Sequence, residues 1–145
     1  MSDDRRNLHE FAAAVLRAQP FSRLLGAELA SVTAEAVQLG LTITEELRQQ
    51  YGMAHGGVIA YLADNSLTFA GGLALGDDVV TAQMNIHYLN PARGDRLLAR
   101  AEIISVRDSS ALTRCAVVEL AAGGEEIEIA FATGLIRRIG KRRNG

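Results

Sequence analysis

The sequence predicts an α+β domain in which a curled antiparallel sheet of about five to six strands wraps one long central helix. Residues 58–70 are apolar on nearly every side, other runs alternate between apolar and polar residues, and the links between those runs are short. A helix that is apolar all round must be covered by other structure, and short links join antiparallel strands. With 145 residues, 48% of them apolar, the chain can form one compact core.

The first elements are a helix and a strand. Residues 7–18 place apolar side chains at the spacing of an amphipathic helix, and Pro20 ends that helix. Residues 1–20 are therefore expected to form an N-terminal helix and arm. The next run, residues 37–44, alternates with a period of two, which predicts a half-buried strand.

The central helix is expected over residues 57–70, directly after the pair Gly56 and Gly57. At 1.5 Å per residue it would be about 21 Å long. Four alternating runs follow it, and Gly123-Gly124 supplies a hairpin turn between the last two. These strands are expected over residues 80–88, 96–103, 112–120 and 127–135. With no internal repeat or linker, residues 1–145 are expected to form a single domain that ends in a flexible basic tail, residues 138–145.

Charge and cysteine content limit the possible functions. The last nine residues hold five of the 15 basic residues and no acid, so ten basic and 17 acidic residues give the first 136 a net charge of −7. Such a body repels nucleic acid, and no partner of that kind is expected. Cys115 can form no internal disulfide and is expected to be a buried, inert thiol. Because no export signal is visible and Asp64 interrupts the one apolar segment of membrane length, we expect a cytoplasmic protein that does not bind membranes.

Asp64 is the main candidate for chemistry. It stands in the middle of the apolar helix, where a carboxylate without partners would cost several kcal/mol. It must therefore be hydrogen-bonded, protonated or directed into a cavity. Thr68 lies one turn further on the same face and could donate to it. The alternative is that Asp64 has a purely structural role and braces the sheet.

His55, Gly56 and Gly57 stand where the helix begins. A helix N-terminus presents free N–H groups that can stabilise the oxyanion formed on a carbonyl. An oxyanion donor and a carboxylate eight residues apart indicate acyl transfer or hydrolysis. A structural role in the loop is the favoured interpretation for His55. No histidine pair has the spacing of a metal site.

The segment Tyr51 to Asp64, YGMAHGGVIAYLAD, resembles the signature of hotdog-fold acyl-CoA thioesterases of the PaaI-like group. LGAEL at residues 25–29 and MNIHYLNPA at residues 84–92 support the resemblance, which extends over about residues 20–137. It implies an acyl-CoA substrate, no cofactor, and a homodimer with active sites at its interface, often paired into a homotetramer.

The resemblance also implies roles for individual residues. Asp64 would be the general base or the nucleophile, Gly56 N–H the oxyanion donor with His55 beside it, and Gln49 of the facing subunit would position water or the carbonyl. The orienting hydroxyl would be Thr68 or Thr81, and the sequence leaves that choice open. The residues expected at the substrate are Gly57, Tyr61, Thr81, Met84, Asn85 and Arg137, with Arg93 and Arg138 as alternatives for the coenzyme A phosphates.

The acyl group is not identified by the sequence. An arylacetyl, a hydroxybenzoyl and a medium-chain fatty acyl group all fit small aliphatic and aromatic side chains such as Tyr61, Phe69 and Met84. Two other functions stay open as well. The domain could bind acyl-CoA without turnover, or it could act as a dehydratase or hydratase on an acyl thioester, although the hydratase pattern Asp-x-Asn-Pro-x-His is absent.

Overall fold

The computed structural model describes residues 2–76 and 78–140. Within these residues three α-helices, one short 3₁₀ helix and six strands follow one another along the chain. The helices are α1 (Ser2–Ala18), α2 (Pro20–Leu25), the 3₁₀ helix η1 (Glu45–Leu47) and α3 (Gly56–Leu75). The strands are β1 (Glu28–Val32), β2 (Ala36–Thr42), β3 (Val79–Tyr88), β4 (Arg96–Arg107), β5 (Ser110–Leu120) and β6 (Glu126–Arg138).

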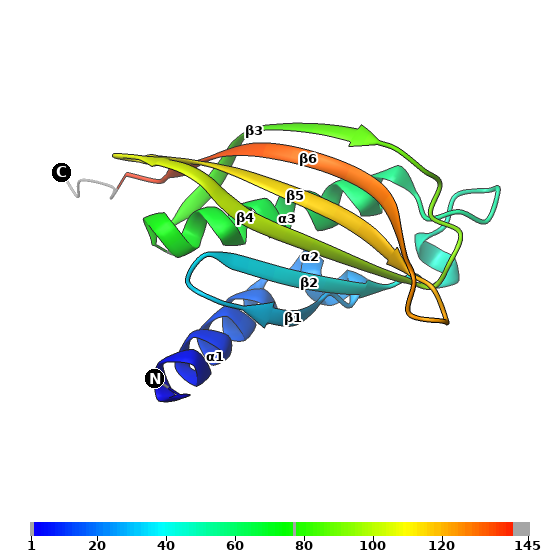
Figure 1. The fold of residues 1–145 in the computed structure, drawn as a ribbon, viewed down its shortest axis with the longest axis horizontal. Coiled ribbons are helices and arrows are strands. Elements are labelled where there is room, and N and C mark those ends of the chain that lie inside the picture. The colour runs from blue at the N-terminus through cyan, green and yellow to red at the C-terminus, as the bar shows by residue number, and fades with distance from the viewer. Residues whose placement is uncertain (1, 77, 141–145) are drawn as a thin grey trace.

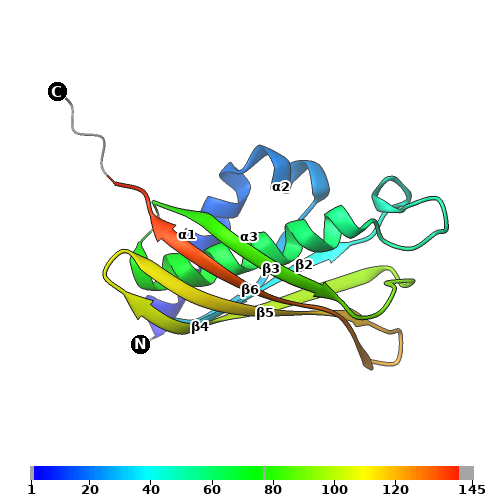
Figure 2. The same ribbon diagram turned by 90° about the horizontal axis from the view of Figure 1, so that it is seen from above.

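The six strands form one sheet in the order β1-β2-β4-β5-β6-β3, and every neighbouring pair is antiparallel. The helix α3 lies along one face of this sheet and packs against β2 to β6, as Figures 1 and 2 show from two directions. The predicted α+β architecture with a long central helix is therefore confirmed. The two edge strands differ in length: β1 has five residues and packs against α1, whereas β3 has ten.

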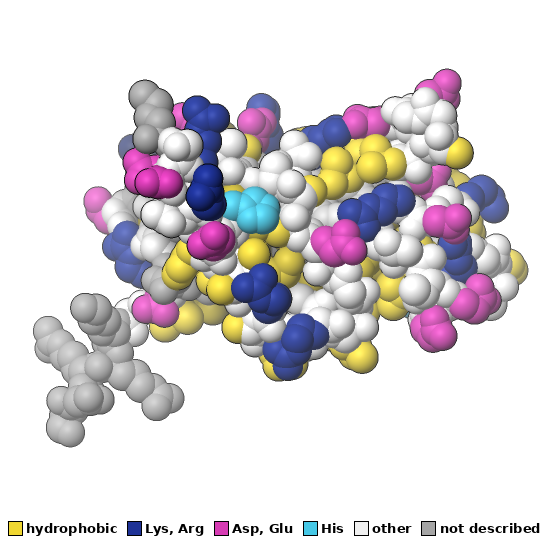
Figure 3. All heavy atoms as spheres, turned by 90° about the horizontal axis from the view of Figure 1, so that it is seen from below, with side chains coloured by type: hydrophobic (Ala, Val, Ile, Leu, Met, Phe, Trp, Pro, Cys, Tyr) yellow, Lys and Arg dark blue, Asp and Glu magenta, His cyan; other side chains and the backbone are white. Residues whose placement is uncertain are grey.

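The core lies between the inner face of the sheet and one side of α3. Leu62 and Leu67 of α3 are completely buried there, together with Leu97 of β4, Val117 of β5 and Ile136 of β6. On the side of the molecule where α1 lies, basic and acidic side chains are interspersed and hydrophobic side chains show between them (Figure 3).

Several boundaries differ from the prediction, and the elements α2, β1 and η1 were not predicted. The first helix begins at Ser2 instead of residue 7, because Asp3 and Asp4 favour the positive end of the helix dipole. Pro20 begins α2 as well as ending α1, since proline fits the first turn of a helix. Strand β1 was not predicted, because apolar and polar residues do not alternate in its sequence, ELASV, and none of its side chains is fully buried.

The C-terminal end of the domain is also longer than expected. Arg138 was assigned to a flexible tail, but it is the last residue of β6, and its Nε donates to the carbonyl oxygen of Leu75 at 3.0 Å. Only residues 139 and 140 of that tail follow as described chain, and residues 141–145 lie outside the described residues. The helix α3 is long and apolar enough to cross a membrane, but half of its most apolar window is buried in the domain, as expected for a core helix.

The contact between α3 and β6 allows no side chain at Gly71. A Cβ built there would lie 2.6 Å from Cβ of the buried Ile136. We expect Gly71→Ala to lower the free energy of unfolding by about 2 kcal/mol, because Ile136 cannot move out of the core. At the neighbouring Gly72 a Cβ would meet only Val79, at 3.6 Å, so Gly72→Ala is expected to stabilise the helix by about 0.5–1 kcal/mol. Urea unfolding of both variants at equal protein concentration checks this pair, and equal effects would contradict the packing.

Because of Cys115, the free energy of unfolding is expected to depend on pH in the alkaline range. Its side chain is fully buried in β5, and this burial raises the pKa of the thiol to about 12, although a backbone hydrogen bond to Arg100 opposes the shift. The unfolded thiol has a pKa of about 8.5, so the unfolded state loses its proton first. The contribution of the buried thiol to the free energy of unfolding is fully present below about pH 8.5. It is lost as the pH rises towards 12, and about 2 kcal/mol of it is lost at pH 10. Urea unfolding at pH 7 and pH 10 measures this loss, and Cys115→Ala should lack the part of it that comes from the thiol.

Candidate active site

The carboxylate of Asp64 is held by a threonine from the neighbouring edge strand. Thr81 of β3 donates from Oγ1 to Asp64 Oδ1 at 2.7 Å. The hydroxyl of Thr68 lies 2.7 Å from that of Thr81 and 2.8 Å from the backbone oxygen of Asp64, and these two acceptors share its single proton. Asp64 is half-buried, and no partner for its Oδ2 lies among residues 2–76 and 78–140. Thus Thr81 contacts the carboxylate, Thr68 supports Thr81, and Oδ2 is free to interact with water or substrate.

The N-terminus of α3 leaves one backbone amide free. His55 is the N-cap residue, and its Nδ1 accepts a hydrogen bond from Gly57 N–H at 2.9 Å. This bond uses the Gly57 amide. Within the described part of the chain no acceptor is found for Gly56 N–H. Gly56 therefore presents the free donor, at the positive end of a 20-residue helix.

Gln49 lines the same cavity as Gly56 and lies on a loop that hydrogen bonds of Arg48 hold in place. The guanidinium of Arg48 donates to the backbone oxygens of Gly52 and Ile43 and to Asp95 Oδ1, at 2.9, 3.2 and 2.8 Å. The side-chain oxygen of Gln49 accepts from the backbone N–H of Tyr51. A cavity of about 280 Å³ is lined by Gln49, Gly56 and the segment from Tyr88 to Ala92, among others.

These residues form two separate groups in one chain. We call Gln49 and Gly56 the amide half-site, and Asp64, Thr68 and Thr81 the carboxylate half-site. Gly56 and Asp64 are eight residues apart on α3, which is about 12 Å along the helix axis. A single carbonyl group cannot contact both. The sequence predicted both groups and the spacing of eight residues, about two helical turns, that separates them.

The other residues expected at the substrate lie in different places. Tyr61 donates from its hydroxyl to Ser22 Oγ at 2.6 Å, accepts from Asn65 Nδ2 at 3.1 Å, and packs edge-on against Phe21 with ring centroids 5.2 Å apart. It thereby fastens α2 to α3. Nothing in the sequence indicated this cluster, since its members lie in two segments far apart in the chain.

Three other residues expected at the substrate lie on the strands of the sheet. Met84 is on the inner face, whereas Asn85 and Arg137 are on the outer face, away from Asp64. Met84 is directed inwards and packs against the core. Asn85 and Arg137 are exposed, and the alternation of β3 and β6 places them on the outer face. One chain therefore does not bring Asn85 or Arg137 together with the carboxylate half-site, and their binding roles stay predictions. Arg93 in the loop before β4 is also exposed, whereas Arg138 is fastened to Leu75.

A long helix lying across a six-stranded antiparallel sheet defines the hotdog class of α+β proteins. Residues 51–120 match the model of the thioesterase superfamily. Human acyl-coenzyme A thioesterase 13 is 30% identical over 128 residues, which are 85% of this chain and 90% of that protein. The chain therefore belongs to the thioesterase superfamily, a family of thioester hydrolases, and the resemblance seen in the sequence is confirmed.

Solved structures support the same fold. A thioesterase family protein from Silicibacter pomeroyi is 27% identical, with a TM-score of 0.80 over 88% of this chain and 98% of that one. The Escherichia coli PaaI protein of the phenylacetic acid degradation operon is 21% identical, with a TM-score of 0.75 over 89% of this chain and 91% of its own, and shows the fold alone. Two relatives from Halobacterium salinarum and Haemophilus influenzae, named as candidate esterases, are matched over only 60% and 61% of their length.

Proposed function

We propose that this protein hydrolyses an acyl-CoA thioester to a free acid and coenzyme A. The observation that carries the proposal is the pairing of a carboxylate with a free oxygen atom, Asp64 Oδ2, and a free helix N-terminal amide, Gly56 N–H, on one helix. General-base attack on a carbonyl needs these two groups. The name of the human relative, an acyl-coenzyme A thioesterase, supports the same substrate class.

The reaction requires two copies of the chain, because the half-sites of one chain are too far apart. The ten-residue edge strand β3 offers unpaired backbone groups to a second β3. In each chain Thr81, near the start of β3, contacts Asp64, and Tyr88, at its end, donates to the backbone oxygen of Gly56. Antiparallel pairing of the two β3 strands would bring the Tyr88 end of one beside the Thr81 end of the other. The amide half-site of one chain would then face the carboxylate half-site of its partner.

In this arrangement Asp64 Oδ2 takes a proton from water while the water oxygen attacks the thioester carbonyl carbon. Thr81 fixes the carboxylate, and Gly56 N–H of the facing chain stabilises the negative oxygen of the tetrahedral intermediate. The C–S bond then breaks, coenzyme A leaves as the thiolate, and the proton on Asp64 returns to the thiolate or to solvent. The Gln49 amide orients the water or the carbonyl.

The alternative is direct attack by Asp64 on the carbonyl carbon. This step expels coenzyme A as the thiolate and leaves a mixed anhydride, which water then hydrolyses. A single turnover in H₂¹⁸O distinguishes the two routes. Attack by water places ¹⁸O in the acid product, whereas attack of water on the Asp64 carbonyl of an anhydride leaves ¹⁸O in the protein. We favour the general base because Oδ2 lacks a protein partner in the described part of the chain.

We also propose the cofactor requirement, the oligomeric state and the cellular location that the sequence led us to expect. The thiolate is a good leaving group, so the reaction needs no metal and no cofactor apart from the coenzyme A of the substrate. Dimers pair further into a homotetramer, and the protein acts in the cytoplasm. Arg137, exposed at the end of β6, is the proposed contact for the phosphates of coenzyme A.

Thiol release tests the activity. The wild-type protein is mixed with acetyl-, butyryl-, decanoyl-, palmitoyl-, phenylacetyl- and hydroxybenzoyl-CoA, and free thiol and free acid are both measured. We expect equal amounts of the two products from at least one substrate. Tight binding of these compounds without release of thiol would replace hydrolysis by simple acyl-CoA binding.

A further inference from the structure

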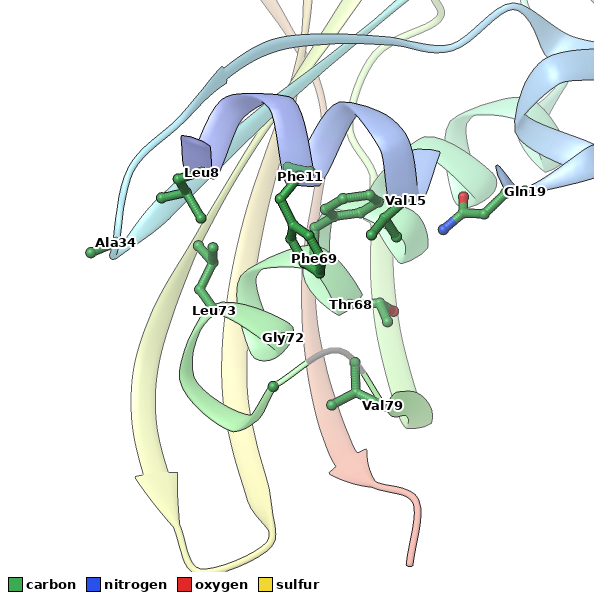
Figure 4. A pocket seen from close by; sticks show the side chains of 12 residues that line it. Leu8, Phe11, Val15, Gln19, Ala34, Thr68, Phe69, Gly72, Leu73 and Val79 are labelled. Carbon is green, nitrogen blue, oxygen red and sulfur yellow. The ribbon is translucent and has the colours of Figure 1, made fainter. Parts of the chain in front are cut away.

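A cavity of the described chain lies between α1 and the C-terminal half of α3 (Figure 4). Its volume is about 440 Å³. Leu8, Phe11 and Val15 of α1 form one wall, and Phe69, Gly72 and Leu73 of α3 face them. The lining is almost entirely apolar, yet the Phe11 side chain is 54% exposed. A cavity with these walls has apolar surface for a ligand to cover.

The cavity adjoins the carboxylate half-site at Thr68. Asp64, Thr68 and Gly72 are separated by four residues each, which places them on one face of α3. Thr68 is a wall residue of the cavity, and its hydroxyl touches that of Thr81, which holds the carboxylate. An acyl group whose carbonyl lies at Asp64 can therefore extend along α3 directly into the space under α1.

The volume of the cavity favours a hydrocarbon chain over a single aromatic ring as the acyl group. A cavity of about 150 Å³ holds one benzene ring, that is, six carbon atoms. The space under α1 is almost three times as large, so one aromatic ring would leave most of it empty. By the same scale it has room for a chain on the order of ten carbons or more.

The chemistry of the lining agrees with a hydrocarbon chain. Gln19 is the one amide side chain in the lining, and its Oε1 already accepts from Ser22 Oγ and Asn65 Nδ2, at 2.6 and 3.0 Å. The Gln19 amide oxygen therefore offers no free acceptor to a ring hydroxyl. We propose that the cavity binds the hydrocarbon chain of an unbranched medium-chain acyl group and that α1 limits its length. This inference rests on the proposed thioesterase activity and names its substrate class.

Gly72→Leu tests the proposal by filling the cavity. A Cβ at Gly72 meets only Val79, at 3.6 Å, and Gly72 lines the cavity, so we expect the larger side chain to enter the cavity. Each buried methylene contributes about fourfold to kcat/KM, and the leucine should displace at least two of them. We expect the ratio of kcat/KM for decanoyl-CoA over butyryl-CoA to fall at least tenfold. The matched control, Gly123→Leu in the β5–β6 turn, has no neighbour within 4 Å and should leave this ratio unchanged.

A second measurement separates this proposal from the activity itself. The Kd of decanoyl-CoA is measured for Asp64→Asn, with and without Gly72→Leu, because binding needs no turnover. Weaker binding with Gly72→Leu supports the cavity even if hydrolysis fails for every substrate. An unchanged Kd together with an unchanged substrate ratio overturns the proposal while leaving thioester hydrolysis intact. A preference for phenylacetyl-CoA that survives Gly72→Leu would overturn it as well.

Discussion

Asp64→Asn is expected to lower kcat for acyl-CoA hydrolysis by about 10²- to 10⁴-fold, the range that a positioned general base contributes. Asparagine has the same shape, and its side-chain oxygen can still accept the hydrogen bond from Thr81, so the half-buried site keeps its structure. What is lost is the ability of Oδ2 to take a proton from water. The rate of thiol release at saturating substrate measures the loss.

Two observations make this result specific. The melting temperature of Asp64→Asn should stay within a few degrees of the wild type, since no hydrogen bond to the carbonyl oxygen at this position is removed. The matched control is Asp108→Asn, which neutralises an exposed carboxylate in the turn between β4 and β5. Equal activity of Asp64→Asn and the wild type would mean that Asp64 only braces β3 through Thr81.

Gly56→Pro is expected to lower kcat by about 10²- to 10³-fold, because proline removes the one N–H proposed to stabilise the oxyanion. Gly56 is the first residue of α3, the helix position where proline is most readily accepted. The preceding residue, His55, already has φ −62° and ψ 137°, the extended conformation that a following proline requires. The substitution therefore deletes the donor with little expected disturbance of the helix, and circular dichroism checks the fold.

Gly56→Ala is the control for the side chain. Its Cβ would lie 3.8 Å from the Tyr88 ring, an ordinary contact, and the N–H remains. Its loss of activity should be much smaller than that of Gly56→Pro. Similar losses in the two variants would show that crowding at this position, and not the missing donor, slows the reaction.

Mixing the two inactive variants tests whether the half-sites come from different chains. If they do, a dimer with one Asp64→Asn chain and one Gly56→Pro chain has one intact site and one doubly altered site. Random exchange of subunits should then restore about a quarter of the wild-type activity. No recovery after verified exchange would contradict a site shared between chains.

The sequence predicted the central helix and the later strands because burial imposes a regular period on their side chains. It could not predict α2, since Pro20 serves equally to end one helix and to begin another. Only part of the candidate active site could be predicted from the sequence. Gly56 and Asp64 were recognisable from the motif, but the hydrogen bond between Thr81 and Asp64 depends on how β3 lies against α3. That placement is set by the packing of the whole sheet, which no local pattern in the chain contains.

The N-cap role of His55 at the start of α3 limits which side chains are compatible with both stability and activity at position 55. His55 occupies the Gly57 amide and so leaves Gly56 as the free donor. Asparagine and serine are neutral and cap helices well, so they should be found among functional variants in a library randomised at this position. Aspartate caps equally well, but its negative charge would stand beside the developing oxyanion. Aspartate at position 55 should therefore be found among stable variants but not among active ones. This outcome would separate helix capping from catalysis as requirements on this side chain.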